Sequence, residues 1–177
     1  MISGMCMMCD GFSQEDMFAH DAAIIEEHGY LVSGVGSGDP PHWTYTVGLL
    51  DRVGHPELIV AGPHFEVAGG LINEIGHLIL EGRRFQVGDT WTSPPGTVRF
   101  GAVHPIQYRL GTFNVWLGLE ESGYLQSTEL EAIQVVAPTG SFCRCDLCVQ
   151  PDLSRPESRV GVAPLHPNRA ARRSRRR

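Results

Sequence analysis

The sequence contains no lysine, no long hydrophobic run and no cysteine from residue 10 to residue 142. No apolar run approaches the roughly 20 residues that span a bilayer, so no membrane helix is expected. The first nine residues lack the basic start and long apolar core of a signal peptide. We therefore expect a cytoplasmic protein, and in the cytoplasm thiols stay reduced and able to bind metal.

Since lysine is absent, all 14 basic side chains are arginine. Six lie in the last nine residues: Arg169, Arg172, Arg173, Arg175, Arg176 and Arg177. The first 168 residues then hold eight arginines against all 20 acidic residues, a net charge of −12. Residues 1–168, with this negative charge, are not expected to bind nucleic acid over their whole surface. The Arg-rich tail, in contrast, can contact phosphates of RNA. A solvated tail that binds nothing is the other interpretation.

The five cysteines gather at two places, near the start and near residue 150. Each place holds a Cys-x-x-Cys pair, and two such pairs are the ligand set of a structural zinc site. We predict that one zinc ion joins the two ends of a single domain. The predicted ligands are Cys6, Cys9, Cys145 and Cys148, with Cys143 as a substitute ligand.

These cysteines have three alternatives to zinc binding: disulfide bonds, a redox-active pair and an iron–sulfur cluster. Disulfides are disfavoured because the number of cysteines is odd and no signal peptide precedes them. A redox pair at Cys6 and Cys9 would open a helix, but residues 10–13 separate that pair from the helix expected next. An iron–sulfur cluster also suits four thiolates and stays the alternative to zinc.

Two segments have the periodicity of amphipathic helices. Residues 14–28 follow Ser13, which we expect to cap the helix together with Asp16, and they end at Gly29. The second helix is expected over residues 65–79. A loop is expected over residues 51–57.

Alternating or short apolar runs indicate strands elsewhere. They are expected at residues 30–35, 43–49, 58–61, 84–87, 98–103 and 113–119. Residues 129–136 fit either a last helix or a strand, and Gln134, Val135 and Val136 favour the end of a strand. These elements predict one α+β domain over residues 1–150, with a mostly antiparallel sheet flanked by two main helices and closed by the metal-bound cysteine turns. Residues 151–177 are rich in Pro and Arg and are expected to be a disordered tail.

A catalytic interpretation depends on titratable groups in the middle of the chain. Tyr45, His55, Glu57, His64 and His104 can line a cleft, and a histidine two residues from a carboxylate can bind metal or shuttle protons. In the structural interpretation, His55 shapes a loop and Glu57 caps or pairs locally. No phosphate loop, nucleophile elbow or metalloprotease helix motif is present. We predict no catalytic site, and Tyr45, His55 and Glu57 are the alternative.

Trp43-Thr-Tyr-Thr-Val-Gly-Leu49 followed by His55-Pro-Glu-Leu58 resembles a bacterial family named as a domain of unknown function, family 4262. The N-terminal cysteine pair and Gln134-Val-Val136 are also similar to that family. The resemblance spans about residues 6–150 and implies a fold and a bacterial origin, but no activity. Many members carry a Pro-Trp-Asp type segment where this chain has its second cysteine group, so the metal site belongs to a subset of the family.

Thiolate-bound zinc together with a basic arm is similar to bacterial accessory factors that act on ribosomes under zinc limitation. One such actinobacterial factor recruits a hibernation factor to the ribosome. This likeness implies a non-catalytic, zinc- or stress-responsive adaptor that contacts the ribosome or RNA and a protein partner there. An enzyme of unknown reaction and a structural domain with an inert tail are the alternative functions.

Overall fold

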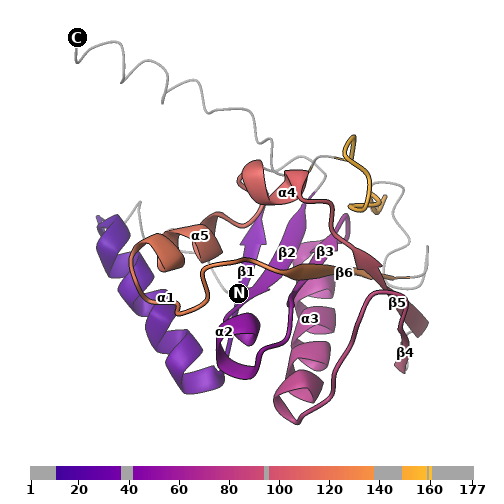
Figure 1. The fold of residues 1–177 in the computed structure, drawn as a ribbon, viewed down its shortest axis with the longest axis horizontal. Helices are drawn as coiled ribbons and strands as arrows, with labels where there is room; N and C mark the ends of the chain where they lie inside the picture. The colour runs from indigo at the N-terminus through magenta and orange to yellow at the C-terminus, as the bar shows by residue number, and fades with distance from the viewer. Residues whose placement is uncertain (1–10, 37–41, 94–95, 138–148, 159, 161–177) are drawn as a thin grey trace.

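The computed structural model describes residues 11–36, 42–93, 96–137, 149–158 and 160. They form a six-stranded sheet in the order β1-β2-β3-β6-β5-β4 (Figure 1). The strands are β1 (Leu31–Val35), β2 (Trp43–Val47), β3 (Glu57–Ala61), β4 (Thr90–Ser93), β5 (Gly96–Ala102) and β6 (Ala132–Val136). Only β3 and β6 run parallel, and the other neighbouring pairs are antiparallel. The predicted α+β class and mostly antiparallel sheet are confirmed.

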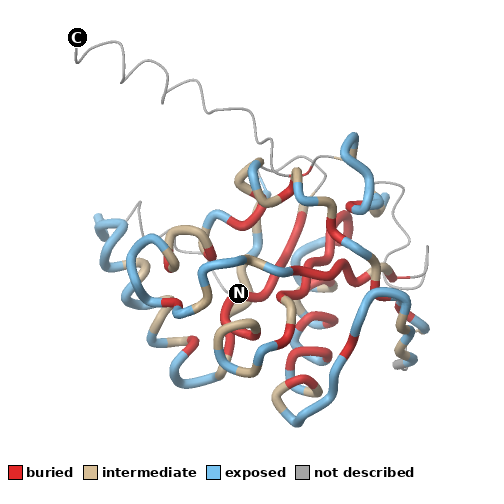
Figure 2. Tube along the Cα trace, in the orientation of Figure 1, coloured by how far each residue is buried: buried red, intermediate tan, exposed pale blue. Residues whose placement is uncertain are grey.

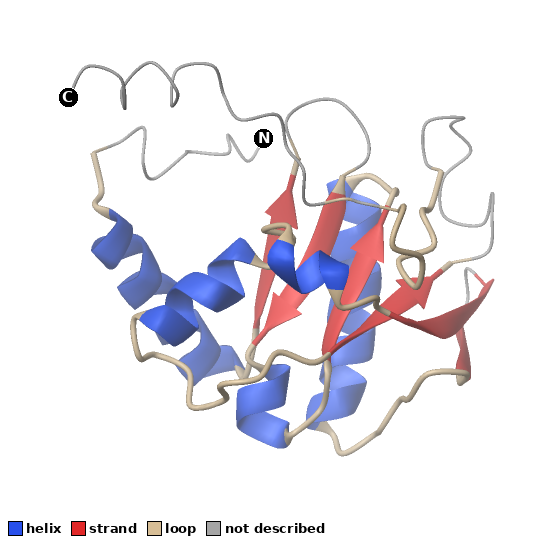
Figure 3. Ribbon diagram, turned by 45° about the horizontal axis from the view of Figure 1, so that its top comes forward, coloured by secondary structure: helices blue, strands red, loops and turns tan. Residues whose placement is uncertain are grey.

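Helices cover both faces of this sheet, as Figure 3 shows. They are α1 (Gln14–His28), α2 (Leu49–Val53), α3 (Phe65–Leu80), α4 (Ile106–Arg109) and α5 (Asn114–Glu121). The two longest, α1 and α3, are the helices that periodicity predicted. The predicted capping of α1 is confirmed, because Ser13 Oγ accepts the Asp16 N–H and Asp16 Oδ2 accepts the Ser13 N–H.

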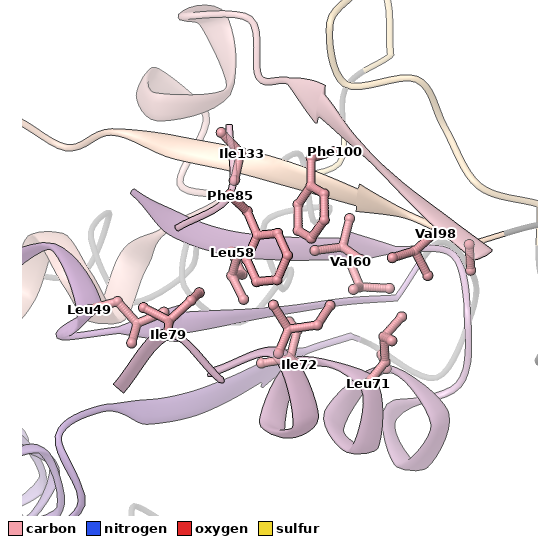
Figure 4. Packing of buried hydrophobic residues seen from close by; sticks show 14 of the residues in the cluster. Leu49, Leu58, Val60, Leu71, Ile72, Ile79, Phe85, Val98, Phe100 and Ile133 are labelled. Atoms are coloured by element: carbon pink, nitrogen blue, oxygen red, sulfur yellow. The ribbon is translucent and has the colours of Figure 1, made fainter. Parts of the chain in front are cut away.

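One hydrophobic core lies between α3 and the sheet. Helix α3 is buried at Ala68, Leu71, Ile72, Ile75 and Ile79, spacings that place these side chains on one helical face. Figure 4 shows this face directed at residues of β3, β5 and β6. Burial of this stripe fixes α3 on one face of the sheet, with its backbone nearest to β1, β2 and β3.

A second core lies on the opposite face, under α1, α4 and α5. Its largest fully buried side chains are Tyr45, Phe113 and Trp116. Strands β2 and β3 are buried along their whole length because both of their faces are covered (Figure 2). This explains the apolar run of β3 at residues 58–61 and the burial of Thr44 and Thr46 within the alternating sequence of β2.

Two predicted strands are wrong. Residues 113–119 alternate in hydrophobicity, yet they lie in α5, because Phe113, Trp116 and Leu119 are buried at the three-residue spacing of one helical face. Residues 84–87 lie in the loop and turn between α3 and β4, and they pair with no strand in the part of the chain that the structure describes. There only Phe85 is buried, stacked on Phe100 with ring centroids 4.5 Å apart.

Sequence patterns also missed three elements, α2, α4 and β4, and left one open. The predicted loop at 51–57 is wrong in part, since α2 occupies residues 49–53 between two glycines with positive φ, Gly48 and Gly54. Strand β4 was not predicted, and it pairs only with β5 at the edge of the sheet. Residues 132–136 are a strand, as their β-branched content suggested.

The packed part of the chain continues past the predicted boundary at residue 150. Leu153 is fully buried in the core under α4 and α5, and Val160 is buried there too. The Gln134 side chain fixes this segment, donating to Pro151 O (2.7 Å) and accepting the Leu153 N–H (2.8 Å). The tail therefore cannot begin at 151, because an apolar anchor follows. Residues 161–177, with the six tail arginines, lie outside the described residues.

Candidate functional site

Glu57 is a carboxylate with no solvent exposure at the first position of β3. Its Oε1 accepts the N–H groups of Gly48 (2.8 Å) and Leu50 (3.2 Å), and its Oε2 accepts the Thr46 hydroxyl (2.6 Å). Burial raises the pKa of Glu57 to about 6, although these hydrogen bonds favour the charged form. The carboxylate thus holds the turn that enters α2.

His55 is a buried imidazole with both ring nitrogens in hydrogen bonds to the backbone. Its Nε2 accepts the Phe85 N–H (3.1 Å), so the ring proton lies on Nδ1, which donates to Pro56 O (2.7 Å). Burial lowers the pKa of His55. In this position the neutral ring ties the loop before β3 to the loop after α3.

Tyr45 is the third residue of the predicted alternative site and has no solvent exposure. Its hydroxyl accepts the Val115 N–H (3.0 Å), and its ring meets Phe113 edge-on with centroids 5.0 Å apart. Burial raises the pKa of Tyr45 to about 12. The side chain therefore anchors the first turn of α5 on the sheet.

A cleft of about 740 Å³ opens beside His55, where the ends of β5 and β6 meet the loop after α3 and helix α4. Its lining includes Gly54, His55, Pro56, Arg84, Phe85, Gln86, Val87, Asp89, Ala102, Val103, Tyr108, Glu131, Ala132 and Ile133. Of the five titratable residues that the sequence suggested for a cleft, only His55 lines it.

The cleft presents polar groups that the sequence analysis did not single out. Arg84 is held by a hydrogen bond from Nη2 to Val53 O (2.6 Å). The Tyr108 hydroxyl accepts the Ala132 N–H (3.2 Å), and burial raises the pKa of Tyr108. Glu131 lies at the rim. Arg84 and Glu131 stand on separate loops and Tyr108 stands on α4, so no local motif could have marked them.

All five cysteines of the predicted metal site lie outside the described residues. Within the described part of the chain, no group of three or more His, Cys, Asp or Glu side chains is arranged to hold a metal ion. A histidine pair does occur at one end of the sheet, where the rings of His42 and His64 have centroids 6.3 Å apart. Of the two, only His64 is among the titratable groups that the sequence suggested.

The described architecture defines the chain as a two-core α+β domain, with one mixed sheet between helical layers. Residues 24–141 match the model of the domain of unknown function family (DUF4262), and this match covers most of the chain. The chain belongs to that family, which confirms the resemblance seen at residues 43–58.

Comparison with curated proteins and with solved structures finds no match. Among the described residues, no helix is long and apolar enough to cross a bilayer.

Proposed function

We propose that this protein is a non-catalytic zinc-binding accessory protein, a zinc- or stress-responsive adaptor that acts at the ribosome or on RNA. The non-catalytic part rests on one observation: the three candidate catalytic side chains are buried and hydrogen-bonded to the backbone. Tyr45, His55 and Glu57 each bond to the backbone of a different loop or helix end, away from solvent. Groups fixed in this way stabilise the fold and have few positions left for a substrate.

The zinc part of the proposal is supported by the two cysteine groups and by how the second is attached to the domain. Gln150 forms a pair of hydrogen bonds with Ala137, accepting its N–H (2.9 Å) and donating to its carbonyl (2.7 Å). The two residues border the segment 138–149, which contains Cys143, Cys145 and Cys148. This pair holds Ala137, which follows β6, next to Gln150.

Native mass spectrometry of the full chain from zinc-replete cells tests the metal. We expect one zinc per chain, lost in the Cys9→Ser and Cys145→Ser variants. A brown protein that contains iron would favour the iron–sulfur cluster over zinc. A metal-free wild-type protein would refute the zinc proposal.

The adaptor part of the proposal is supported by six tail arginines next to an acidic body. Arginines that neutralise phosphates release counterions. The logarithm of the binding constant should therefore fall linearly with the logarithm of the salt concentration. We expect the intact protein to sediment with ribosomes at low salt, and a chain that lacks residues 167–177 to stay in the supernatant. Equal sedimentation of both proteins across the salt range would contradict a tail-mediated contact. An Arg-to-Lys tail separates simple charge from bidentate or stacking contacts.

The cleft supports a second candidate function, the binding of a small molecule. Its volume of about 740 Å³ is within the range of ligand sites, roughly 300–1,000 Å³. Arg84 and Glu131 offer opposite charges, the Tyr108 hydroxyl can donate its own hydrogen, and Phe85 supplies an apolar wall. A zwitterion with an apolar side chain, such as an amino acid or dipeptide, satisfies these groups together.

Ligand-observed NMR with a panel of amino acids and dipeptides tests this candidate. We expect binding that disappears in Arg84→Ala and is unchanged in Glu81→Ala, an exposed site outside the cleft lining. No binding by any member of the panel would exclude this ligand class.

A further inference from the structure

Strand β5 is paired with its neighbour β4 along only part of its length. The ladder between them covers residues 96–99 of β5. One residue further on, the Phe100 N–H donates to Asp89 O (2.9 Å), and Phe100 O accepts the Gly88 N–H (2.8 Å). Two residues opposite one form a β-bulge, and a glycine with positive φ, here Gly88 at 99°, is typical of one class of bulge. A bulge of this kind bends the chain and ends the pairing.

The loop that would continue this ladder is held in another place. The Phe85 N–H donates to His55 Nε2 (3.1 Å), and Arg84 Nη2 donates to Val53 O (2.6 Å). These two bonds tie the loop to the last residue of α2 and to the segment before β3. Ala102, the last residue of β5, therefore has no strand beside it on the side away from β6.

The backbone of Ala102 presents an unpaired donor and acceptor to the cleft. Along a regular strand, the N–H and C=O groups of alternate residues point to the same edge. The register with β6 continues to Ala102, so its two groups point to the same edge as those of Phe100, away from β6. Neither group has a hydrogen-bond partner among the described residues. Ala102 is exposed and lines the cleft of about 740 Å³.

We propose that this cleft binds an extended peptide of three or more residues, and that an interior residue of the peptide pairs with Ala102 as an added strand. This inference rests on the small-molecule candidate of the proposed function and narrows its ligand class. Peptides add to exposed sheet edges in this way, through main-chain hydrogen bonds. An interior residue has an uncharged N–H and C=O on one edge, the complement of Ala102. A free amino acid or a dipeptide has no interior residue.

The charged groups of the cleft suit the two ends of such a peptide. The Arg84 guanidinium has further donors beyond the one bound to Val53 O, and a guanidinium matches a terminal carboxylate. Glu131 on the rim matches a terminal ammonium group. Three extended residues span about 10 Å. A peptide of this length thus satisfies the charges and the strand edge together, whereas an amino acid satisfies only one of these sets at a time.

A series of small ligands tests the pairing from the side of the peptide. The probes are leucine, the dipeptide Ala-Leu and the tripeptide Ala-Leu-Ala, titrated into the full chain by calorimetry. We expect the tripeptide to bind about tenfold more tightly than the dipeptide, because its interior leucine adds hydrogen bonds to Ala102. Methylation of the leucine nitrogen should remove this gain. Methylation of the last alanine nitrogen is the matched control, since that N–H points to the opposite edge of the peptide.

Two variants test the same bond from the side of the protein. Ala102→Pro removes the N–H donor without loss of a bond to β6, and Gly101 before it is already in a strand, as a residue preceding proline prefers. Ala102→Ser keeps the donor and is the control. We expect Ala102→Pro to weaken binding of the tripeptide about tenfold and Ala102→Ser to leave it unchanged. In the wild type, the Ala102 amide proton should shift downfield when the tripeptide binds.

The outcomes separate this inference from the candidate function beneath it. Equal affinity for Ala-Leu and Ala-Leu-Ala, with no effect of leucine methylation, would overturn the strand pairing and leave small-molecule binding intact. No binding by any of the probes would overturn both. Circular dichroism shows whether Ala102→Pro is folded. If that variant does not fold, the two methylated tripeptides decide the question on the wild-type protein.

Discussion

At the scale of single residues, buried polar side chains act as supports for loops in this domain. Glu57 and His55 are separated by one residue, yet they bond to different segments, the turn before α2 and the loop after α3. A buried donor or acceptor that loses its partner costs about 1–3 kcal/mol. The spacing of a histidine and a carboxylate, which suggested proton transfer, is explained here by two separate backbone anchors.

His55→Ala is expected to destabilise the protein by about 2–3 kcal/mol, because it leaves the Phe85 N–H and the Pro56 carbonyl without their partner. Urea unfolding measures the change. Glu131→Ala, at an exposed position on the rim of the same cleft, should change the free energy of unfolding by less than about 0.5 kcal/mol. Equal effects of the two substitutions would contradict the anchoring role.

Glu57 makes stability depend on pH in a definite direction. Its pKa is about 6 in the folded state against a model value of 4.5, so the folded protein binds this proton more tightly. The resulting stabilisation is fully present below about pH 4.5 and is lost as pH rises through about 6. The shift corresponds to about 2 kcal/mol.

Glu57→Gln should remove this dependence, because the amide does not titrate in that range. The measurement is the difference in unfolding free energy between wild type and variant at several pH values from 4.5 to 7.5. We expect the wild type to lose about 2 kcal/mol relative to the variant over this interval. A difference that stays constant with pH would refute the raised pKa.

At the scale of elements, α3 depends both on its local sequence pattern and on its tertiary contacts. Its apolar periodicity determines where the helix forms, and its contacts determine which of its glycines can be replaced by alanine. Gly70 has open space where a Cβ would be, whereas a Cβ at Gly76 would lie 2.6 Å from Cζ of Tyr30. Tyr30 is buried and donates its hydroxyl hydrogen to Asn73 of α3, so its ring cannot move freely.

The same substitution at Gly70 and at Gly76 should therefore have opposite effects. Gly70→Ala is expected to stabilise the protein by about 0.5–1 kcal/mol through helix propensity. Gly76→Ala should destabilise it, because the Tyr30 ring must shift and lose its bond to Asn73. Thermal unfolding of the two variants measures both. A stabilising Gly76→Ala would show that this contact adapts without cost.

At the scale of the whole molecule, the sheet is completed by segments far apart in the sequence. β6 inserts between β3 and β5, and Leu153 then returns to close the core under α4 and α5. Gln134 on β6 bonds to both Pro151 and Leu153, so the central strand and the last packed segment depend on each other. The chain thus needs its residues near 153 for a complete core.

Two truncations test this dependence. A chain that ends at residue 150 should be destabilised by about 2–5 kcal/mol, as expected for loss of one fully buried leucine. A chain that ends at residue 166 keeps that leucine and should unfold at the same urea concentration as the full protein. Equal stability of the two truncated chains would mean that Leu153 is dispensable for the core.

The sequence by itself determined the elements that have a strong local signal. The capping box at Ser13, the stop at Gly29 and the apolar face of α3 depend on contacts within about four residues, so both long helices were predicted correctly. The motif at residues 43–58 was sufficient to indicate the family. The positions of the five cysteines indicate a metal, a prediction that awaits its measurement.

Only the tertiary structure decided the rest, because those features depend on partners distant in sequence. Residues 113–119 alternate like a strand, but burial of Phe113 and Trp116 in the same core as Tyr45 selects a helix. The neighbours of His55 and the convergence of His42 with His64 arise from strand pairing, which no local pattern records. Short segments have too few local interactions to choose a conformation, so long-range burial and hydrogen bonds choose it for them.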